Sequence, residues 1–248
     1  MSIDIKNKAN KIKSRKKLAK KTKFILLLLL LFLLGLYLVI SVIYNNGNFS
    51  ITLDDNLYYK KSLIIYDDPE YKVYRSELLA PAPETFDNIS YKWLPEDLHK
   101  YEGSHNGENY LAYSFYIENT GEMSTDYWSE IEVSDVIKNV DEAVRVRVYK
   151  DDEYVTYALA KKDGTPEKNT TPFLSDEIVA IDHVEDFNPG DKIKYTIVLW
   201  IEGSDLECTD NILGGEFKIQ MHFNSEFVDG EKGKKKWKTK NMLEESKN

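Results

Sequence analysis

A stretch of 21 residues without a charged side chain, Phe24 to Tyr44, constrains this chain more than any other feature. At 1.5 Å per residue it forms a helix of about 31 Å, which matches the ~30 Å hydrocarbon core of a bilayer. Its first half, Phe24 to Leu34, has no polar face, which argues against a helix in a soluble core. We therefore predict one transmembrane helix over residues 24–44, with the lipid bilayer as its partner.

The charge before this stretch predicts its orientation. Residues 1–23 carry ten Lys or Arg against one acid, Asp4, and basic residues beside a first span stay on the cytoplasmic side. A cleaved secretory signal is the alternative, but its apolar region is only about 7 to 15 residues long and precedes a small-x-small site. This run continues to Tyr44. We expect an uncleaved, single-pass signal anchor in the cell membrane, with a cytoplasmic basic arm and an extracellular C-terminal domain.

Charge and cysteine content narrow the class of the extracellular domain. Residues 45–230 hold 38 acidic and 16 basic side chains, a formal charge of about −22, which repels nucleic acid and excludes it as a partner. The last residues, 231–248, hold seven Lys and three Glu and read as a basic flexible tail. Cys208 is the single cysteine, so no internal disulfide forms. An extracellular domain without disulfides fits a Gram-positive cell surface better than an animal one.

The domain alternates apolar and polar residues with a period of two, which is typical of strands with one buried face. Turn signals such as Asn188-Pro189-Gly190-Asp191 separate the runs. We also predict a strand at Tyr127–Val133 and a helical turn at Ser134–Val140. The inward-facing sets that we predict are Phe49, Ile51 and Leu53; Leu111, Tyr113, Phe115 and Ile117; Val144, Val146 and Val148; Ile193, Tyr195, Ile197 and Leu199; and Phe217, Ile219, Met221 and Phe223.

These patterns predict an all-β chain: a jelly-roll-like antiparallel β-sandwich ectodomain over residues 45–230, behind one N-terminal transmembrane helix. Residues 80–109 contain three of the seven prolines and no strong alternation. We expect a loop-rich insertion there.

Motifs of the common enzyme classes are missing from the sequence. The four histidines form no H-E-x-x-H, and there is no G-x-S-x-G, P-loop or G-x-G-x-x-G. Cys208 has acidic neighbours, Glu207 and Asp210, which raise a thiol pKa and make a poor nucleophile. We predict no catalytic residues, no bound cofactor and no enzymatic activity.

The one local constellation with metal chemistry is an acidic loop between the last two predicted strands. Glu202, Asp205, Glu207 and Asp210 place four carboxylates in nine residues. Hard oxygen ligands of this kind suit extracellular Ca²⁺, although the spacing matches no EF-hand. We name these four residues as the candidate metal site. The alternative is a solvated hairpin loop without an ion.

The same region carries a resemblance to a known family. The run from Tyr195 to Asp210, followed by Leu213-Gly214-Gly215-Glu216 and a strand, resembles surface proteins of Gram-positive bacteria related to the TasA and camelysin group, of the SipW-dependent type. The segments Ile117–Gly121 and Asp141–Tyr149 are similar too. The resemblance implies a jelly-roll-like β-sandwich exported to the surface, of a kind that sometimes assembles into biofilm-matrix fibres by donating strands between subunits. Its camelysin part implies a metalloprotease, although the zinc motif is missing here.

Two functions remain open from the sequence. The first is a membrane-tethered surface β-sandwich with a structural or interaction role, an anchor or accessory subunit of an extracellular matrix or fibre. Its partners would be other surface proteins, or further copies of itself, bound by strand addition. The alternative is a metal-dependent surface hydrolase of the camelysin type, built around the 202–210 loop or His183.

Overall fold

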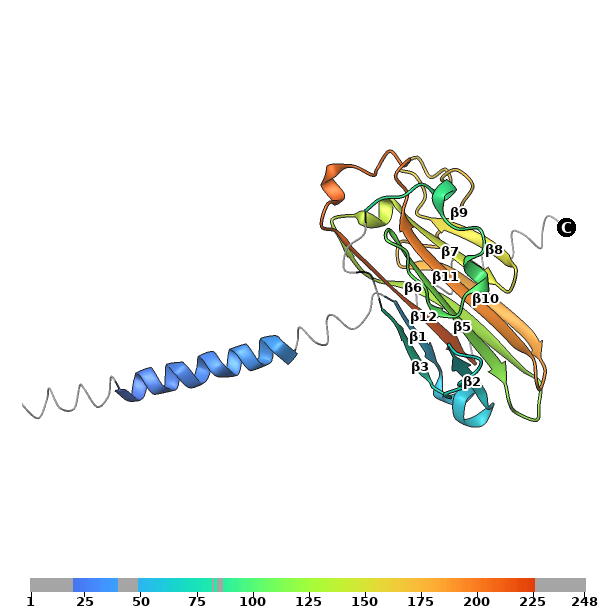
Figure 1. The fold of residues 1–248 in the computed structure, drawn as a ribbon, viewed down its shortest axis with the longest axis horizontal. Helices are drawn as coiled ribbons and strands as arrows, with labels where there is room; N and C mark the ends of the chain where they lie inside the picture. The colour runs from blue at the N-terminus through green and yellow to red at the C-terminus, as the bar shows by residue number, and fades with distance from the viewer. Residues whose placement is uncertain (1–19, 40–48, 82, 84–86, 226–248) are drawn as a thin grey trace, which may run out of the picture. The chain divides into compact units, whose positions relative to one another are not determined.

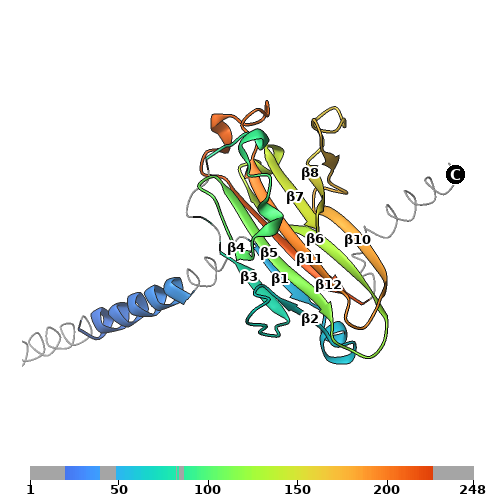
Figure 2. The ribbon, with the colours of Figure 1, turned by 45° about the vertical axis from the view of Figure 1, so that its right-hand side comes forward.

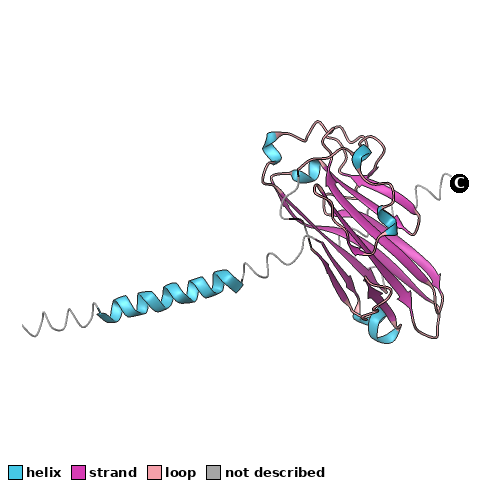
Figure 3. Ribbon diagram, viewed as in Figure 1, coloured by secondary structure: helices cyan, strands magenta, loops and turns pink. Residues whose placement is uncertain are grey.

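The computed structural model describes residues 20–39, 49–81, 83 and 87–225. One unit is an apolar helix from Lys20 to Val39 that is long enough to cross a membrane. It overlaps the predicted span, whose residues 40–44 lie outside the described residues, as do most of the basic arm and the tail 231–248. The second unit, from Phe49 onward, consists mostly of strands (Figure 3).

The strands form two sheets (Figure 1 and, turned by 45°, Figure 2). In sheet A the order is β10 (Ile178–Phe187), β6 (Thr125–Ile137), β12 (Glu216–Asn224), β1 (Phe49–Leu53) and β3 (Glu77–Ala80). In sheet B the order is β2 (Leu63–Tyr66), β5 (Tyr110–Asn119), β11 (Lys192–Ile201), β7 (Val144–Lys150), β8 (Glu153–Ala158) and β9 (Thr171–Pro172), and β4 (Gly103–Ser104) also pairs with β5. The short helical turns are η1 (Asn56–Lys60), η2 (Tyr91–Trp93), η3 (Leu98–Lys100), η4 (Val140–Glu142) and η5 (Asp210–Ile212).

Both sheets are mixed, so the prediction of purely antiparallel sheets is wrong. β1 runs parallel to β12, from Phe49 beside Ile219 to Leu53 beside Phe223. β8 and β9 are parallel over two residues. Neither pair is joined by a tight hairpin, which would force antiparallel pairing, because β1 and β12 come from opposite ends of the domain and a loop of 12 residues separates β8 from β9.

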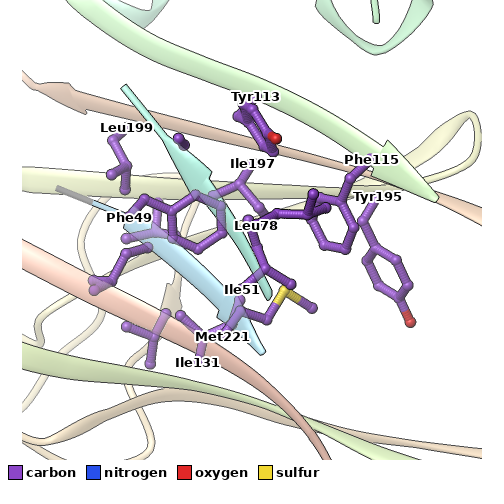
Figure 4. Close-up of a cluster of buried hydrophobic side chains, with 14 of the residues drawn as sticks. Phe49, Ile51, Leu78, Tyr113, Phe115, Ile131, Tyr195, Ile197, Leu199 and Met221 are labelled. Atoms are coloured by element: carbon purple, nitrogen blue, oxygen red, sulfur yellow. The ribbon is translucent and has the colours of Figure 1, made fainter. Parts of the chain in front are cut away.

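One hydrophobic core lies between the two sheets (Figure 4). The inward-facing sets predicted from the alternation line it, with Val148, Ile193 and Phe217 half-buried at its border. The predicted helical turn at Ser134–Val140 is wrong over its first half, because β6 continues to Ile137. Pairing with β12 supplies backbone partners there, and the turn η4 begins only at Val140.

A second, smaller core covers the outer face of sheet B. The segment between β3 and β5 folds over the sheet, and Leu94 and Leu98 from its turns pack against Val198 and Trp200 of β11. Trp200 is therefore only 2% exposed although it points away from the main core. Burial on both faces explains why β11 reads as a nearly continuous apolar run.

Candidate functional site

The acidic loop predicted as the metal site follows β11 and precedes β12, the last two strands, as the sequence indicated. These strands belong to different sheets, so the loop crosses from sheet B to sheet A at one end of the domain. The alternative prediction from the sequence, a hairpin loop, is therefore wrong in its connectivity. The crossover brings loop side chains over the outer face of sheet B, beside β7.

Glu202, the first of the four predicted ligands, is buried and fully engaged in hydrogen bonds. Its carboxylate accepts bonds from Trp200 Nε1 at 3.0 Å, the backbone N–H of Tyr91 at 2.9 Å and Ser204 Oγ at 2.6 Å. Burial alone would raise the pKa of Glu202, but these bonds hold it below its usual value. Glu202 thus ties the end of β11 to η2, and its carboxylate oxygens are occupied by donors of the protein.

Asp205 forms a buried ion pair with Arg145 of β7. Both side chains are almost completely buried, and the guanidinium also lies 3.5 Å from the carboxylate of Glu167. Burial opposes the charge of Asp205. Hydrogen bonds from Glu207 and Arg145 outweigh it, and the pKa of Asp205 falls below its ordinary value. The guanidinium of Arg145 therefore supplies positive charge beside the carboxylates of Asp205 and Glu167.

Two of the four predicted ligands come together, with a third residue that the sequence did not indicate. Asp205, Glu207 and Glu167 place carboxylate oxygens within 4.8 Å of one another. The hydrogen bond to Asp205, together with its charge, raises the pKa of Glu207. Asp210 begins η5, is exposed and is not part of this group, nor is Glu202. Glu167 belongs to the loop before β9, and no spacing rule links it to the acidic loop.

A cleft of about 470 Å³ lies beside this cluster on the outer face of sheet B. Its floor includes Trp200 and Arg147, and Tyr154 of β8 forms one wall. The Arg147 guanidinium lies over the Tyr154 ring at 4.5 Å and over the Trp200 ring at 5.2 Å. Sequence reasoning missed this cleft, since β7 shows only a regular Val-Arg alternation.

A second groove, of about 320 Å³, lies between β8 and β10, the two strands at one side of the domain. Its lining includes Val155 of β8, Ala180 and Asp182 of β10, and Ile131 and Met221 of the main core. Across it, Lys150 and Asp182 form an ion pair at 2.8 Å. This groove could not be predicted from the sequence, because β8 and β10 were not among the predicted strands.

The other residues considered for chemistry lie in ordinary structural surroundings. Cys208 is half-buried, and burial, followed by the charges of Asp205, Asp87 and Glu202, raises the pKa of its thiol. This is the direction expected from the sequence, although the acids responsible are different. His183 lies on β10 of sheet A, stacked on Trp128 at 3.9 Å. It contributes no ligand to the Glu167–Asp205–Glu207 group.

Comparison with known proteins assigns no family. No family model matches the chain, and no curated protein matches it significantly. Among solved structures, a β-glucosidase from Kluyveromyces marxianus in complex with glucose is similar at a TM-score of 0.24 and 10% identity. The similarity covers 69% of this chain and 16% of the enzyme, so the chain spans about a sixth of that protein. At this TM-score the similarity supports neither fold nor function.

Proposed function

We propose that this protein is a membrane-tethered surface domain that binds a partner by accepting a β-strand. The strand enters at the groove between β8 and β10, which we name the open side. The observation that carries the proposal is that β10, an edge strand of sheet A, and β8 of sheet B, which has a neighbour over only two residues, flank a groove that reaches the main core. Such an arrangement offers backbone hydrogen bonds and apolar side-chain pockets together.

The strand edges at the open side lack neighbours in the part of the chain that the structure describes. β10 is the last strand of sheet A, and β8 pairs with β9 only at Tyr157 and Ala158. Val155 pairs with the inward-facing Val148 and shares its face, yet it is 43% exposed. The other side of the domain differs, because the chain itself passes there from β2 to β3. Arg75, in this connection, forms a β-bridge with Ile65 of β2. An apolar residue exposed on an inner face indicates that the sandwich lacks a covering strand there.

Charge favours a basic partner. The domain carries a formal charge of about −22 over residues 45–230, and Glu153 and Asp182 lie at the groove itself. An extended segment with alternating apolar and basic residues would place its apolar side chains in the groove and its basic ones near these acids. We therefore commit to a basic strand of another surface protein, and not to a second copy of this acidic domain.

We also propose that the domain has a jelly-roll-like strand order, that the N-terminus lies in the cytoplasm, and that the protein is an anchor or accessory subunit of an extracellular matrix. The successive connections from β5 to β6, β6 to β7, β10 to β11 and β11 to β12 each cross between the sheets, which supports the jelly-roll-like assignment. The apolar helix Lys20–Val39 and the ten basic residues before Phe24 support the orientation. The hydrolase alternative gains no support from the geometry of the described residues.

The orientation is tested with intact protoplasts. Added protease should digest the domain after residue 48 while the basic arm stays protected. Mass spectrometry of the membrane-bound protein should find residues 1–44 still attached. A domain that is cut only after lysis would reverse the orientation, and a mature chain starting near Asn45 would establish a cleaved signal.

Strand acceptance is tested with the full chain in nanodiscs of zwitterionic lipid and a synthetic ten-residue peptide of alternating Val and Lys. Hydrogen exchange should slow in β8 and β10 when the peptide binds. Val155→Asp should weaken binding at least tenfold. Leu79→Asp, a matched change at an apolar residue 47% exposed on the other edge of sheet A, should leave it unchanged. Equal losses in the two variants, or no saturable binding, would overturn the proposal.

A further inference from the structure

The cleft over Arg147 lies on the outer face of sheet B and shares Tyr154 with the groove of the open side. We propose that it binds an oxyanion, a carboxylate or a phosphate, carried on a hydroxyl-rich chain such as an acidic sugar or a polyol phosphate. The proposal is carried by a fixed guanidinium without a carboxylate partner, exposed aromatic rings beside it, and neutral polar side chains along the wall.

Of the two arginines on β7, Arg147 is the one whose positive charge is available to a ligand. Arg145 and Arg147 are two residues apart and therefore share the outer face of sheet B. Arg145 is 4% exposed and is neutralised by Asp205 and Glu167. Arg147 is half-buried, and no described carboxylate lies within ion-pair distance of it. A partly desolvated, unpaired cation is unfavourable unless an anion joins it.

The surroundings of Arg147 fix its guanidinium in place. Its Nε donates to Thr156 Oγ1 at 3.0 Å and its Nη1 to the Tyr149 hydroxyl at 3.4 Å. The Tyr154 and Trp200 rings hold the planar group by cation–π contacts. Guanidinium has five N–H donors, and these two bonds leave three for a ligand. An immobilised fork of donors is suited to the two oxygens of a carboxylate or phosphate.

Three of the four carboxylates that line the cleft are compensated by the protein, and the hydrogen bond to Asp205 raises the pKa of the fourth, Glu207. Glu202 is engaged by its own hydrogen bonds, and Asp205 is paired with Arg145. Glu167 lies 3.5 Å from Arg145 and 4.0 Å from Lys161. Lys168, exposed on the same wall, adds a further positive charge. The charge that remains for a ligand near Arg147 is positive, although the domain as a whole is strongly acidic.

The rest of the lining favours a hydroxyl-rich body for the ligand. Asn169, Thr170 and Ser204 offer neutral donors and acceptors. Tyr154 is 56% exposed and Tyr91 is also exposed, so their rings can pack against the C–H faces of a sugar. The cleft volume of about 470 Å³ is within the ~300–1,000 Å³ range of small-molecule sites.

The test uses the full chain in nanodiscs of zwitterionic lipid, with binding followed by calorimetry at low and high salt. The probes are trigalacturonate for the carboxylate source, glycerol 3-phosphate for the phosphate source, and maltotriose as the neutral control. We expect saturable, salt-sensitive binding of at least one anionic probe and none of maltotriose. The stronger anionic probe identifies the source.

The variants separate a ligand site from a structural contact. Arg147→Met keeps the apolar stem and removes the charge, and it should raise the Kd at least tenfold. Arg147→Lys keeps the charge without the fork and should give an intermediate Kd. Lys100→Met, the same change at an exposed lysine outside the cleft, should leave the Kd unchanged. Wild-type affinity in a folded Arg147→Met variant, equal binding of maltotriose, or no saturable binding of either anionic probe would overturn the proposal.

Discussion

The buried pair of Arg145 and Asp205 should be worth far more in a mutational cycle than a surface pair of the same chemistry. We consider Arg145→Met, Asp205→Leu and the double variant, which replace each partner by an apolar residue of similar size. Each single change leaves one charge without its partner in a nearly water-free place, since Arg145 is 4% exposed and the Asp205 side chain is fully buried.

The expected magnitude follows from that burial. Removing one partner of a buried ion pair destabilises a protein by about 3–5 kcal/mol, whereas replacing both with apolar groups is often neutral. Glu167, 3.5 Å from Arg145, retains part of the compensation when Asp205 is removed. We therefore expect about 3 kcal/mol for Asp205→Leu, somewhat more for Arg145→Met, and a double variant within about 1 kcal/mol of the wild type.

The assay is urea unfolding of the full chain in a non-ionic detergent, followed by tryptophan fluorescence. The control is the Lys150–Asp182 pair, which has a close contact of 2.8 Å but side chains that are 39% and 54% exposed. A cycle on that pair should give less than about 1 kcal/mol of coupling. Similar coupling in the two cycles, or a double variant as unstable as the sum of the singles, would refute the reasoning.

Three further predictions follow from the same structure. Because the pKa of Asp205 is depressed in the folded state, its ionised carboxylate stabilises the fold above the unfolded pKa of about 3.9. This stabilisation is lost as the pH falls through the lower folded pKa. The free energy of unfolding should therefore fall less steeply with decreasing pH in the Arg145→Met/Asp205→Leu double variant than in the wild type. Leu199→Ala, in the main core, should lower the free energy of unfolding by about 2–5 kcal/mol, and Lys100→Ala, at an exposed residue of η3, by less than ~0.5 kcal/mol; equal effects would mean that Leu199 is not part of the core. Millimolar Ca²⁺ should shift the melting midpoint no more than Mg²⁺ does, because Arg145 already pairs with Asp205 and Glu167; a larger shift that EGTA reverses would assign a Ca²⁺ site to the Glu167–Asp205–Glu207 group.

Local alternation was sufficient to predict the main core. The inward sets on β5, β11 and β12 are buried as expected, apart from the half-buried Ile193 and Phe217, because a period of two places every second residue on the face that meets the other sheet. β10 escaped prediction because it is an edge strand with irregular pairing between Ile178 and Ala180 and between Val184 and Phe187. Each irregularity shifts the side-chain alternation and hides the period.

The outer face of sheet B could not be predicted for a different reason. Alternation places Arg145 and Arg147 of β7 and Trp200 of β11 on the face opposite the main core, but it does not show what covers that face. Segments distant in sequence cover it: Leu94 and Leu98 lie over Trp200, and the acidic loop lies over Arg145. Arg145 and Asp205 are 60 residues apart, and no local pattern signals such a contact.

The acidic loop therefore has a different physical role from the one its composition suggests. Four carboxylates in nine residues indicate a cation site, and the fold supplies Arg145 as the cation while turning Glu202 toward Trp200 and Tyr91. Because these two contacts join β11 to η2, the loop and the insertion that precedes β5 hold each other over sheet B. The cleft above Arg147 lies between the acidic loop and the loop before β9, with Tyr91 of η2 at its border, so its shape depends on how these segments are held.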